Sequence, residues 1–164
     1  MARSTTLGFP RIGPHRELKR ATEGHWAGRV GDDELDAVAR AIRADGWRRQ
    51  ADAGIDLLPS NDFSLYDHVL DTICTVGAAP DRFTTADTSS EPGSRFALAR
   101  GRVAADGTNV APLEMTKWFD TNYHYLVPEL GPTTRFHLAS DQAVDAVVEA
   151  RVAGHVTRPV LVSP

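Results

Sequence analysis

The chain has 164 residues, of which 41% are hydrophobic and 24% are charged, values that fit one globular domain and exclude a disordered or fibrous protein. Its net charge of −4 argues against a nucleic-acid-binding protein, which needs a dominant positive surface, and no apolar run reaches the ~18 residues of a membrane span. The single cysteine, Cys74, excludes an internal disulfide and a cysteine-rich zinc site, and the lack of a secretory signal at the N-terminus predicts a cytoplasmic protein.

The first third of the chain combines an apolar run with two helical patterns. The stretch "TTLGFPRIG", residues 5–13, predicts a strand that runs out into a loop at its glycines and prolines. A helix is predicted from Arg16 onward, with Gly28 as its stop. The segment "DDELDAVARAIRADGWRRQADAG" predicts a second helix, because its apolar residues recur about every 3.6 positions along one stripe. That stripe consists of Leu35, Val38, Ala39 and Ile42.

Strands and helices continue to alternate in the rest of the chain. "IDLLPSND" predicts a buried strand leading into a polar loop, and "FSLYDHVLDTICTVGA" predicts a helix with Asp62 as its cap. Residues 84–94 are small and polar, which predicts a surface loop. "FHLAS" predicts a short strand, "SDQAVDAVVEARVAGH" a helix capped by Ser140, and "PVLVS" another buried strand.

This order of elements predicts a single domain of the α/β class. Strands that are apolar throughout, rather than at every second residue, are typical of parallel strands covered by helices. In such folds the chemistry lies on loops that follow the carboxyl ends of the strands. Here those loops are "PRIGPHRELK", "PSNDF" and the region around Lys117.

A basic cluster marks the start of the first predicted helix. Arg16, Lys19 and Arg20 are spaced i, i+3 and i+4, so a helix places the three cations on one face. A helix N-terminus also binds anions, and the cluster therefore suits a polyanion. The alternative is a solvated face paired with Glu17 and Glu23. Exposed ion pairs contribute about 0.2–1 kcal/mol each, so such a cluster can hold the tail of a ligand rather than a whole ligand.

An aromatic segment surrounds the second candidate residue, Lys117. In "EMTKWFDTNYHYLVPEL" this lysine is followed by Trp118, Phe119, Tyr123 and Tyr125. A flat π surface beside an ammonium group suits a ligand that carries an aromatic ring system and carboxylates. The alternative is an aromatic core from which Lys117 reaches solvent.

Other polar groups are weaker candidates. Asn61, Asp62, Asp67 and His68 could together hold a metal ion, although a helix cap and a hydrogen-bonded histidine explain them more simply. Cys74 lies in an apolar run and is interpreted as inert packing. The motifs G-x-G-x-x-G, G-x-S-x-G and the P-loop do not occur, so nucleotide binding and serine hydrolysis lack their usual support.

Four stretches taken together resemble the opening part of the cobalamin-independent methionine synthases. They are "TLGFPRIGPHRELKRATEGHW", "AGIDLLPSNDFSLYDHVLDT", "ALARGR" and "EMTKWFDTNYHYLVPEL", and they cover nearly the whole chain in order. The family folds as two (β/α)8 (TIM) barrels. The resemblance therefore implies that residues 1–164 form an N-terminal domain that is an incomplete barrel, roughly the first half of the N-terminal barrel.

The same resemblance implies a function and a set of site residues. Members transfer a methyl group from 5-methyltetrahydropteroyltri-L-glutamate to L-homocysteine and form L-methionine, without cobalamin and with a zinc ion that activates the homocysteine thiol. By motif, Arg16, Glu17, Leu18 and Lys19 of "RELK" and Lys117 of "MTKWF" correspond to positions that bind the folate substrate and its polyglutamate tail. A triglutamate is a local polyanion, which agrees with the basic cluster.

The chain departs from the family in length. The family's zinc ligands, a histidine, two cysteines and a glutamate, belong to the C-terminal catalytic barrel. This chain is therefore expected to have no catalytic residue, metal or cofactor of its own and to be inactive alone, with the folate substrate and the remaining barrels, in cis or in trans, as its partners. Its end just after "PVLVS" predicts an open sheet edge and self-association. The alternatives are a subunit complemented by another chain and a stand-alone, non-enzymatic binding module.

Overall fold

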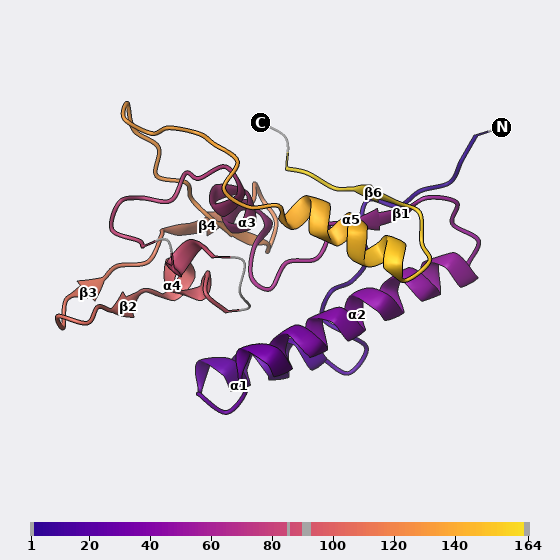
Figure 1. Cartoon of the computed structure of the whole chain (residues 1–164), viewed down its shortest axis with the longest axis horizontal. Coiled ribbons are helices and arrows are strands. Elements are labelled where there is room, and N and C mark those ends of the chain that lie inside the picture. The colour runs from indigo at the N-terminus through magenta and orange to yellow at the C-terminus, as the bar shows by residue number, and fades with distance from the viewer. Residues whose placement is uncertain (1, 85, 90–92, 163–164) are drawn as a thin grey trace. The chain divides into compact units, whose positions relative to one another are not determined.

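The structure is a computed structural model that describes residues 2–84, 86–89 and 93–162 (Figure 1). Part of the predicted loop 84–94, and the last residue of "PVLVS", lie outside the described residues. The chain divides into two compact units, Met1–Leu65 with Gln142–Pro164 and Tyr66–Asp141, and each is described by itself. Both units mix helices with strands, as predicted for an α/β protein, and the described strands form no closed barrel. Within the described ranges, no helix is long and apolar enough to cross a membrane.

The first unit is built on a parallel strand pair. Its elements in chain order are α1 (Glu17–Trp26), α2 (Asp32–Asp52), β1 (Leu58–Ser60), α5 (Gln142–Val152) and β6 (Thr157–Pro159). Strand β1 pairs in parallel with β6, and an isolated parallel bridge joins Thr5 to Leu57. Helix α1 packs on α2, while α2 and α5 both pack on β1. The predicted parallel pairing under helices is therefore confirmed for β1 and β6.

Helix α2 forms where the apolar stripe predicts it. Three acidic residues occupy its first turn, where carboxylates interact favourably with the helix dipole. Leu35 is completely buried, and the indole Nε1–H of Trp47 donates a 2.9 Å hydrogen bond to the Pro59 carbonyl. Trp47, Leu58 and Ala150 form one core cluster, which holds α2 and α5 on the strand.

Two strands of this unit differ from their predictions. The strand predicted at the start of residues 5–13 is reduced to the bridge at Thr5, and the residues after it form the loop that their glycines and prolines predict. The predicted strand 159–163 is displaced, since β6 ends at Pro159, although the Val160 N–H still donates to the Ser60 carbonyl at 2.8 Å. Leu161 is 67% exposed, so the predicted burial of this run is wrong.

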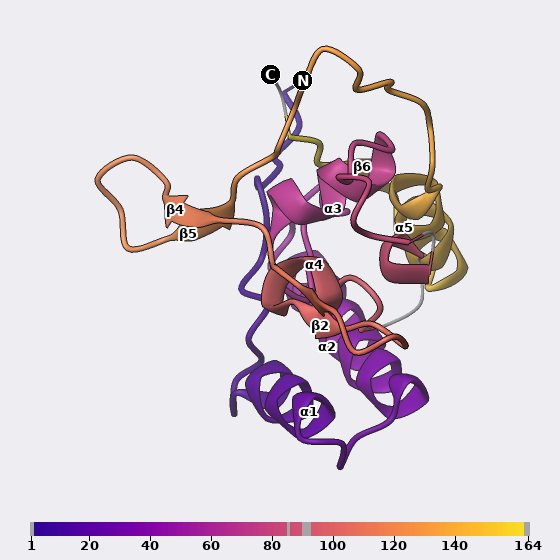
Figure 2. The same cartoon turned by 90° about the vertical axis from the view of Figure 1, so that its left-hand side faces the viewer.

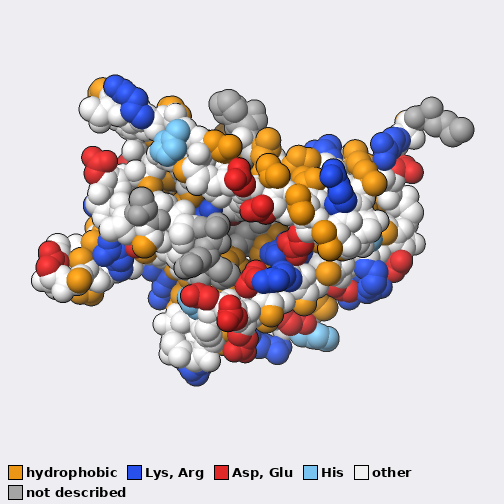
Figure 3. Space-filling model, in the orientation of Figure 1, with side chains coloured by type: hydrophobic (Ala, Val, Ile, Leu, Met, Phe, Trp, Pro, Cys, Tyr) orange, Lys and Arg blue, Asp and Glu red, His pale blue; other side chains and the backbone are white. Residues whose placement is uncertain are grey.

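Hydrophobic side chains gather on the surface over α5 and β6 (Figure 3). Val144, Val148 and Val152 lie four residues apart, so they form one stripe along α5, and their exposed fractions are 59%, 49% and 85%. A contiguous apolar stripe of this kind is typical of a surface that another chain or segment covers. The self-association that the sequence predicts at the open sheet edge beside "PVLVS" concerns a different surface and stays a prediction.

The second unit contains the antiparallel strands. Its elements are α3 (His68–Thr75), a short 3-10 turn η1 (Ala86–Thr88), α4 (Phe96–Arg100), β2 (Arg102–Val103), β3 (Asn109–Val110), β4 (Met115–Lys117) and β5 (His124–Leu126). Strands β2 and β3 form one hairpin, and β4 and β5 form another. The core includes Leu70 of α3, Leu98 of α4 and Leu126 of β5, each at most 1% exposed. Neither hairpin is predicted from the sequence, because strands of two or three residues are too short to show alternation.

Helix α3 is shorter than the predicted helix over residues 63–78. It begins at His68, where the Asp67 side chain caps it by accepting the Leu70 N–H at 2.8 Å. The predicted cap, Asp62, instead accepts the Phe9 N–H at 2.8 Å within the first unit. The prediction of Asp62 as the cap is therefore wrong, because a tertiary hydrogen bond occupies that carboxylate.

The predicted strand "FHLAS" is an irregular segment. Its N–H groups at His137 and Ala139 donate to the carbonyls of Val76 and Thr75, at 3.0 and 2.8 Å. These carbonyls end α3 and have no partner within the helix. The segment is therefore used to close a helix rather than to extend a sheet.

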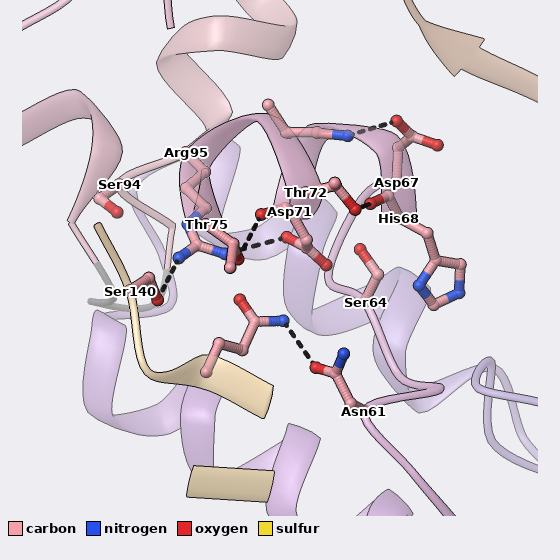
Figure 4. A network of polar contacts seen from close by, with 12 residues as sticks. Asn61, Ser64, Asp67, His68, Asp71, Thr72, Thr75, Ser94, Arg95 and Ser140 are labelled. Atoms are coloured by element: carbon pink, nitrogen blue, oxygen red, sulfur yellow. Dashed lines mark hydrogen bonds and ion pairs between the residues drawn. The ribbon is translucent and has the colours of Figure 1, made fainter. Parts of the chain in front are cut away.

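Two further corrections concern polar side chains of the second unit. Helix α5 begins at Gln142, so Asp141 and not the predicted cap Ser140 directly precedes it. The Ser140 hydroxyl accepts a 3.2 Å hydrogen bond from Arg95, which also pairs with Asp71 at 3.2 Å (Figure 4). In the predicted surface loop, Asp87 of η1 is 8% exposed and pairs with the guanidinium of Arg102 at 2.8 Å. The described part of that loop is thus tied to β2.

Candidate functional site

The segment before α1 folds back on the start of the helix. The Arg16 N–H donates to the Gly13 carbonyl at 3.1 Å, and the Leu18 N–H donates to the Ile12 carbonyl at 3.2 Å. Arg16 has a left-handed backbone, with φ 63° and ψ 37°, which costs an L-residue about 1–2 kcal/mol. Strain of this kind gathers at functional sites. The turn determines where α1 begins and holds Arg16 exposed at that point.

Glu17 is held by the same turn. Its Oε2 accepts the His15 N–H at 2.9 Å, and hydrogen bonds from its own backbone N–H and from that of His15 lower the pKa of the Glu17 carboxyl. Gly13 has a φ of +79°, and a Cβ at this position would collide with Oε2 of Glu17. Glu17 is therefore an ionised group fixed against the loop, and Gly13 is required for that arrangement.

The other predicted residues of α1 divide between solvent and core. The Lys19 ammonium lies 3.5 Å from the Glu23 carboxylate, and both side chains are about half exposed. Arg20 donates to the His15 carbonyl, whereas Leu18 is only 4% exposed. The pairing of Lys19 agrees with the solvated-face alternative. Because an exposed i, i+4 pair contributes only about 0.3–0.5 kcal/mol, Lys19 can exchange Glu23 for another carboxylate.

A groove with a volume of about 580 Å³ lies beside this turn. One side is formed by residues 9–14 and the other by α2, with Glu17 also in contact. A concave, mostly apolar surface with a few charged groups is the usual form of a small-molecule site. Its apolar lining includes Phe9, Ile12, Val38 and Ile42, and its charged lining consists of Glu17, Asp45 and Arg49.

Lys117 lies in the second unit, at the end of β4. It is exposed and stands opposite His124 of β5 in the antiparallel register. Figure 2 shows this hairpin as an orange arm whose loop extends away from α3 and α4. Lys117 therefore belongs to a different unit from Arg16, Glu17, Leu18 and Lys19, and the structure describes these two parts of the predicted site separately.

The aromatic residues near Lys117 form a surface rather than a core. The Trp118 ring contacts Phe119 and Tyr125 edge-on, with centroid distances of 5.4 and 5.3 Å. Trp118 is 41% exposed and Phe119 is 81% exposed, so the aromatic-core alternative is wrong. Phe119 also has a φ of 51°, which is rare for a bulky residue. The hairpin loop thus presents exposed aromatic faces next to an ammonium group.

Lysine usage marks the same two places. Lys19 and Lys117 are the only lysines of the sequence, and all other Lys or Arg positions are arginines. An ammonium group is a compact charge with three donors on a flexible stem, whereas arginine favours fixed bidentate pairs. The composition alone therefore singles out Lys19 and Lys117. The motif-based prediction named both residues but did not use the rarity of lysine.

The described residues do not fit a metal ion. No group of three or more His, Cys, Asp or Glu side chains is placed to hold one within residues 2–84, 86–89 and 93–162. The buried Asp67 carboxylate is occupied by hydrogen bonds from Leu70 and Tyr123. Burial raises the pKa of the Cys74 thiol to about 11, whereas zinc binds thiolate. The zinc ion implied by the family resemblance therefore has no site among these residues.

Titration of Cys74 is expected to destabilise the fold at high pH. Its folded-state pKa of about 11 lies above the ordinary value of 9.0, so the stabilising contribution is present below about pH 9 and is lost as the pH rises through 11. Between pH 8 and 10.5, urea denaturation should show the free energy of unfolding falling about 1–2 kcal/mol further in the wild type than in Cys74→Ala. Parallel pH profiles for the two proteins would contradict this expectation.

Comparisons with known proteins identify the family. A family model described as "Cobalamin-independent synthase, N-terminal domain" matches residues 3–164. Relatives named 5-methyltetrahydropteroyltriglutamate–homocysteine methyltransferase from Streptomyces coelicolor, Parvibaculum lavamentivorans and Salinibacter ruber are 56%, 54% and 49% identical over 99%, 100% and 100% of the chain. The chain spans only 20%, 21% and 22% of their lengths. The chain therefore belongs to the cobalamin-independent synthase family and corresponds to its N-terminal domain.

Proposed function

We propose that the chain contributes part of the folate-substrate site of a methyltransferase. The reaction moves a methyl group from 5-methyltetrahydropteroyltri-L-glutamate to L-homocysteine and yields L-methionine, and the names of the relatives contain both substrates. The observation that carries the proposal is the placement of the chain's two lysines. Lys19 lies on the exposed side of α1 and Lys117 on an exposed hairpin, and the family resemblance implies a folate-binding role at both positions.

The proposal gives each residue a distinct role. Arg16 and Lys19 meet carboxylates of the polyglutamate tail, and Lys117 meets a further carboxylate beside the aromatic surface of its hairpin. Glu17 holds the turn that presents Arg16, while Leu18 anchors α1 in the core. Because each exposed contact contributes about 0.2–1 kcal/mol, selectivity for a long tail arises from several contacts together. The groove beside Glu17 offers the apolar surface that a pteroyl ring system needs.

We further propose that residues 1–164 form one N-terminal domain, the first half of a (β/α)8 barrel. The parallel pairing of β1 with β6 and the parallel bridge from Thr5 to Leu57 support this proposal, since barrel strands are parallel and joined through helices. Zinc chemistry then belongs to other segments, because the chain spans about a fifth of its relatives. Methyl transfer is expected only together with those segments, in cis or in trans.

An alternative function is a subunit or binding module that is complemented by a second chain. The exposed valine stripe of α5 favours it, because a surface of this kind is typical of a protein interface. Co-purification with a separately encoded catalytic chain would support this alternative, and activity of a single continuous polypeptide would remove it.

Binding of tri- and monoglutamate forms of 5-methyltetrahydrofolate by the intact protein tests the main proposal. Calorimetry should show tighter binding of the triglutamate. Because the sequence has only two lysines, amine acetylation followed by mass spectrometry gives an independent result: bound triglutamate should protect both Lys19 and Lys117. Equal affinity for both ligands, with both lysines unprotected, would exclude a tail site.

Lys117→Met is expected to weaken triglutamate binding about two- to fivefold, since it removes one exposed charge contact and keeps the apolar stem. Binding of the monoglutamate should change less. The matched control is Arg135→Met, which removes an exposed cation from the same unit at a position with no proposed role. Equal losses in the two variants would assign the effect to overall charge rather than to Lys117.

A further inference from the structure

The carboxylate of Asp67 joins three parts of the second unit. Its Oδ2 accepts the Leu70 N–H of α3 at 2.8 Å and the Leu126 N–H of β5 at 3.2 Å. Its Oδ1 accepts the Tyr123 hydroxyl at 2.6 Å. Asp67 is 1% exposed, and a carboxyl group that is buried so completely depends on hydrogen bonds from the protein in place of water.

Tyr123 continues this connection to the lysine. Its carbonyl accepts the Trp118 N–H at 2.7 Å, and Trp118 directly follows Lys117. The next residue after Tyr123 is His124, the register partner of Lys117. The side chain of Tyr123 is thus bound to the start of α3, and its backbone is bound beside Lys117.

We propose that Asp67 is a positioning residue that fixes the β4–β5 hairpin, and therefore Lys117, to the N-terminus of α3 through the Tyr123 hydroxyl. This inference rests on the proposed folate-tail site and adds a residue that does not touch the ligand. It gives a physical reason for the buried aspartate. A helix cap alone needs only the Leu70 N–H, whereas this carboxylate also accepts two donors from the hairpin.

The hairpin needs such a tether because it is short and exposed. Its strands have three residues each, and an isolated two-stranded ribbon is marginally stable in water. Its loop carries Phe119, which is 81% exposed and has a φ of 51°. Leu126 anchors one end of β5 in the core, and the Tyr123 hydroxyl bond holds the other end, where His124 pairs with Lys117 of β4.

Tyr123→Phe tests the proposal in the intact protein, because it removes one hydroxyl and keeps the ring. Calorimetry should show triglutamate affinity falling about two- to fivefold, because the tether acts through the exposed Lys117 contact and its loss cannot cost more than the loss of that contact. The matched control is Tyr125→Phe in the same hairpin, since Tyr125 makes a ring contact with Trp118 and its hydroxyl makes no hydrogen bond within the described residues. This control should keep wild-type affinity, and an equal loss in both variants would overturn the proposal.

A double-mutant cycle separates positioning from a general structural effect. In a Lys117→Met background, Tyr123→Phe should weaken triglutamate binding by less than twofold, because the tether acts through the lysine that is already absent. Additive losses would overturn the positioning role. Asp67→Asn keeps the shape of the side chain, and its amide can donate to the Tyr123 oxygen, so this variant should retain more affinity than Tyr123→Phe.

A measurement without ligand keeps the two proposals distinguishable. Hydrogen exchange at the Trp118 amide should be at least about fivefold faster in Tyr123→Phe than in the wild type, because the loop opens more often. An unchanged exchange rate would overturn the tether. Unchanged triglutamate binding in Lys117→Met would instead overturn the proposed function, while the exchange result still decides whether Asp67 holds the hairpin.

Discussion

Replacing Gly77 with alanine is expected to lower the free energy of unfolding of the second unit by about 2–5 kcal/mol. Gly77 follows α3 with a φ of +64°, and a Cβ at this position would collide with the imidazole ring of His137. The left-handed backbone alone costs an L-residue about 1–2 kcal/mol. The His137 backbone is held beside Gly77, because its N–H is bonded to the Val76 carbonyl at 3.0 Å, so the imidazole ring can avoid the new Cβ only by changing its rotamer.

Gly107→Ala is the matched control for this substitution. Gly107 lies in the same unit and has a φ of +84°, but a Cβ there would meet nothing within 4 Å. It should therefore show only the backbone cost in urea denaturation, about 1–2 kcal/mol. Adding His137→Ala to Gly77→Ala removes the clashing ring, so the double variant should regain the part of the unfolding free energy that the steric clash costs. A Gly77→Ala loss no larger than that of Gly107→Ala would mean that the imidazole ring yields without cost.

Asp67→Ala is expected to destabilise the second unit by about 3–5 kcal/mol. The substitution removes the cap of α3, worth about 0.5–2 kcal/mol. It also removes the acceptor of the buried Leu126 N–H, at about 1–3 kcal/mol, and the part-buried hydrogen bond from the Tyr123 hydroxyl, at about 0.5–1.5 kcal/mol. Loss of the near-ultraviolet signal of the hairpin aromatics should accompany the fall in the denaturation midpoint.

Two variants show whether this loss comes from buried hydrogen bonding. Asp106→Ala removes a carboxylate that accepts the Thr108 N–H at 2.9 Å in an exposed turn, so water can replace the acceptor and the loss should stay below about 1 kcal/mol. Asp67→Asn should lose less than Asp67→Ala, because the amide oxygen can still cap α3. If Asp67→Ala were no worse than Asp106→Ala, the three hydrogen bonds of Asp67 would have no net effect on stability.

The sequence motif predicts where α1 begins but not the backbone conformation or the hydrogen bonds at its first turn. The motif "RELK" places Arg16, Glu17 and Lys19 at the beginning of a helix, and α1 begins at Glu17. The motif does not reveal the left-handed backbone of Arg16 or the hydrogen bond from the His15 N–H to Glu17. Both depend on the close approach of Gly13 to the Glu17 carboxylate, which is a property of the folded loop.

The strand predictions fail for a related reason. The run "PVLVS" is apolar enough for a buried strand, yet β6 ends at Pro159 and Leu161 is exposed. The run "FHLAS" donates its N–H groups to the end of α3 instead of to a strand. Apolar composition describes what a segment can bury, whereas pairing depends on which carbonyls of other elements lie within reach.

The amino-acid sequence by itself determined the helices α1 and α2, the buried strand β1 and the family, because helical periodicity, short apolar runs and motifs are local properties. Only the tertiary structure decided the cap of α3, the two hairpins and the partner of Tyr123. The hydrogen bond between Tyr123 and Asp67 joins residues 56 positions apart. No local pattern encodes such a pair, because it forms only when packing of the apolar core brings α3 and β5 together.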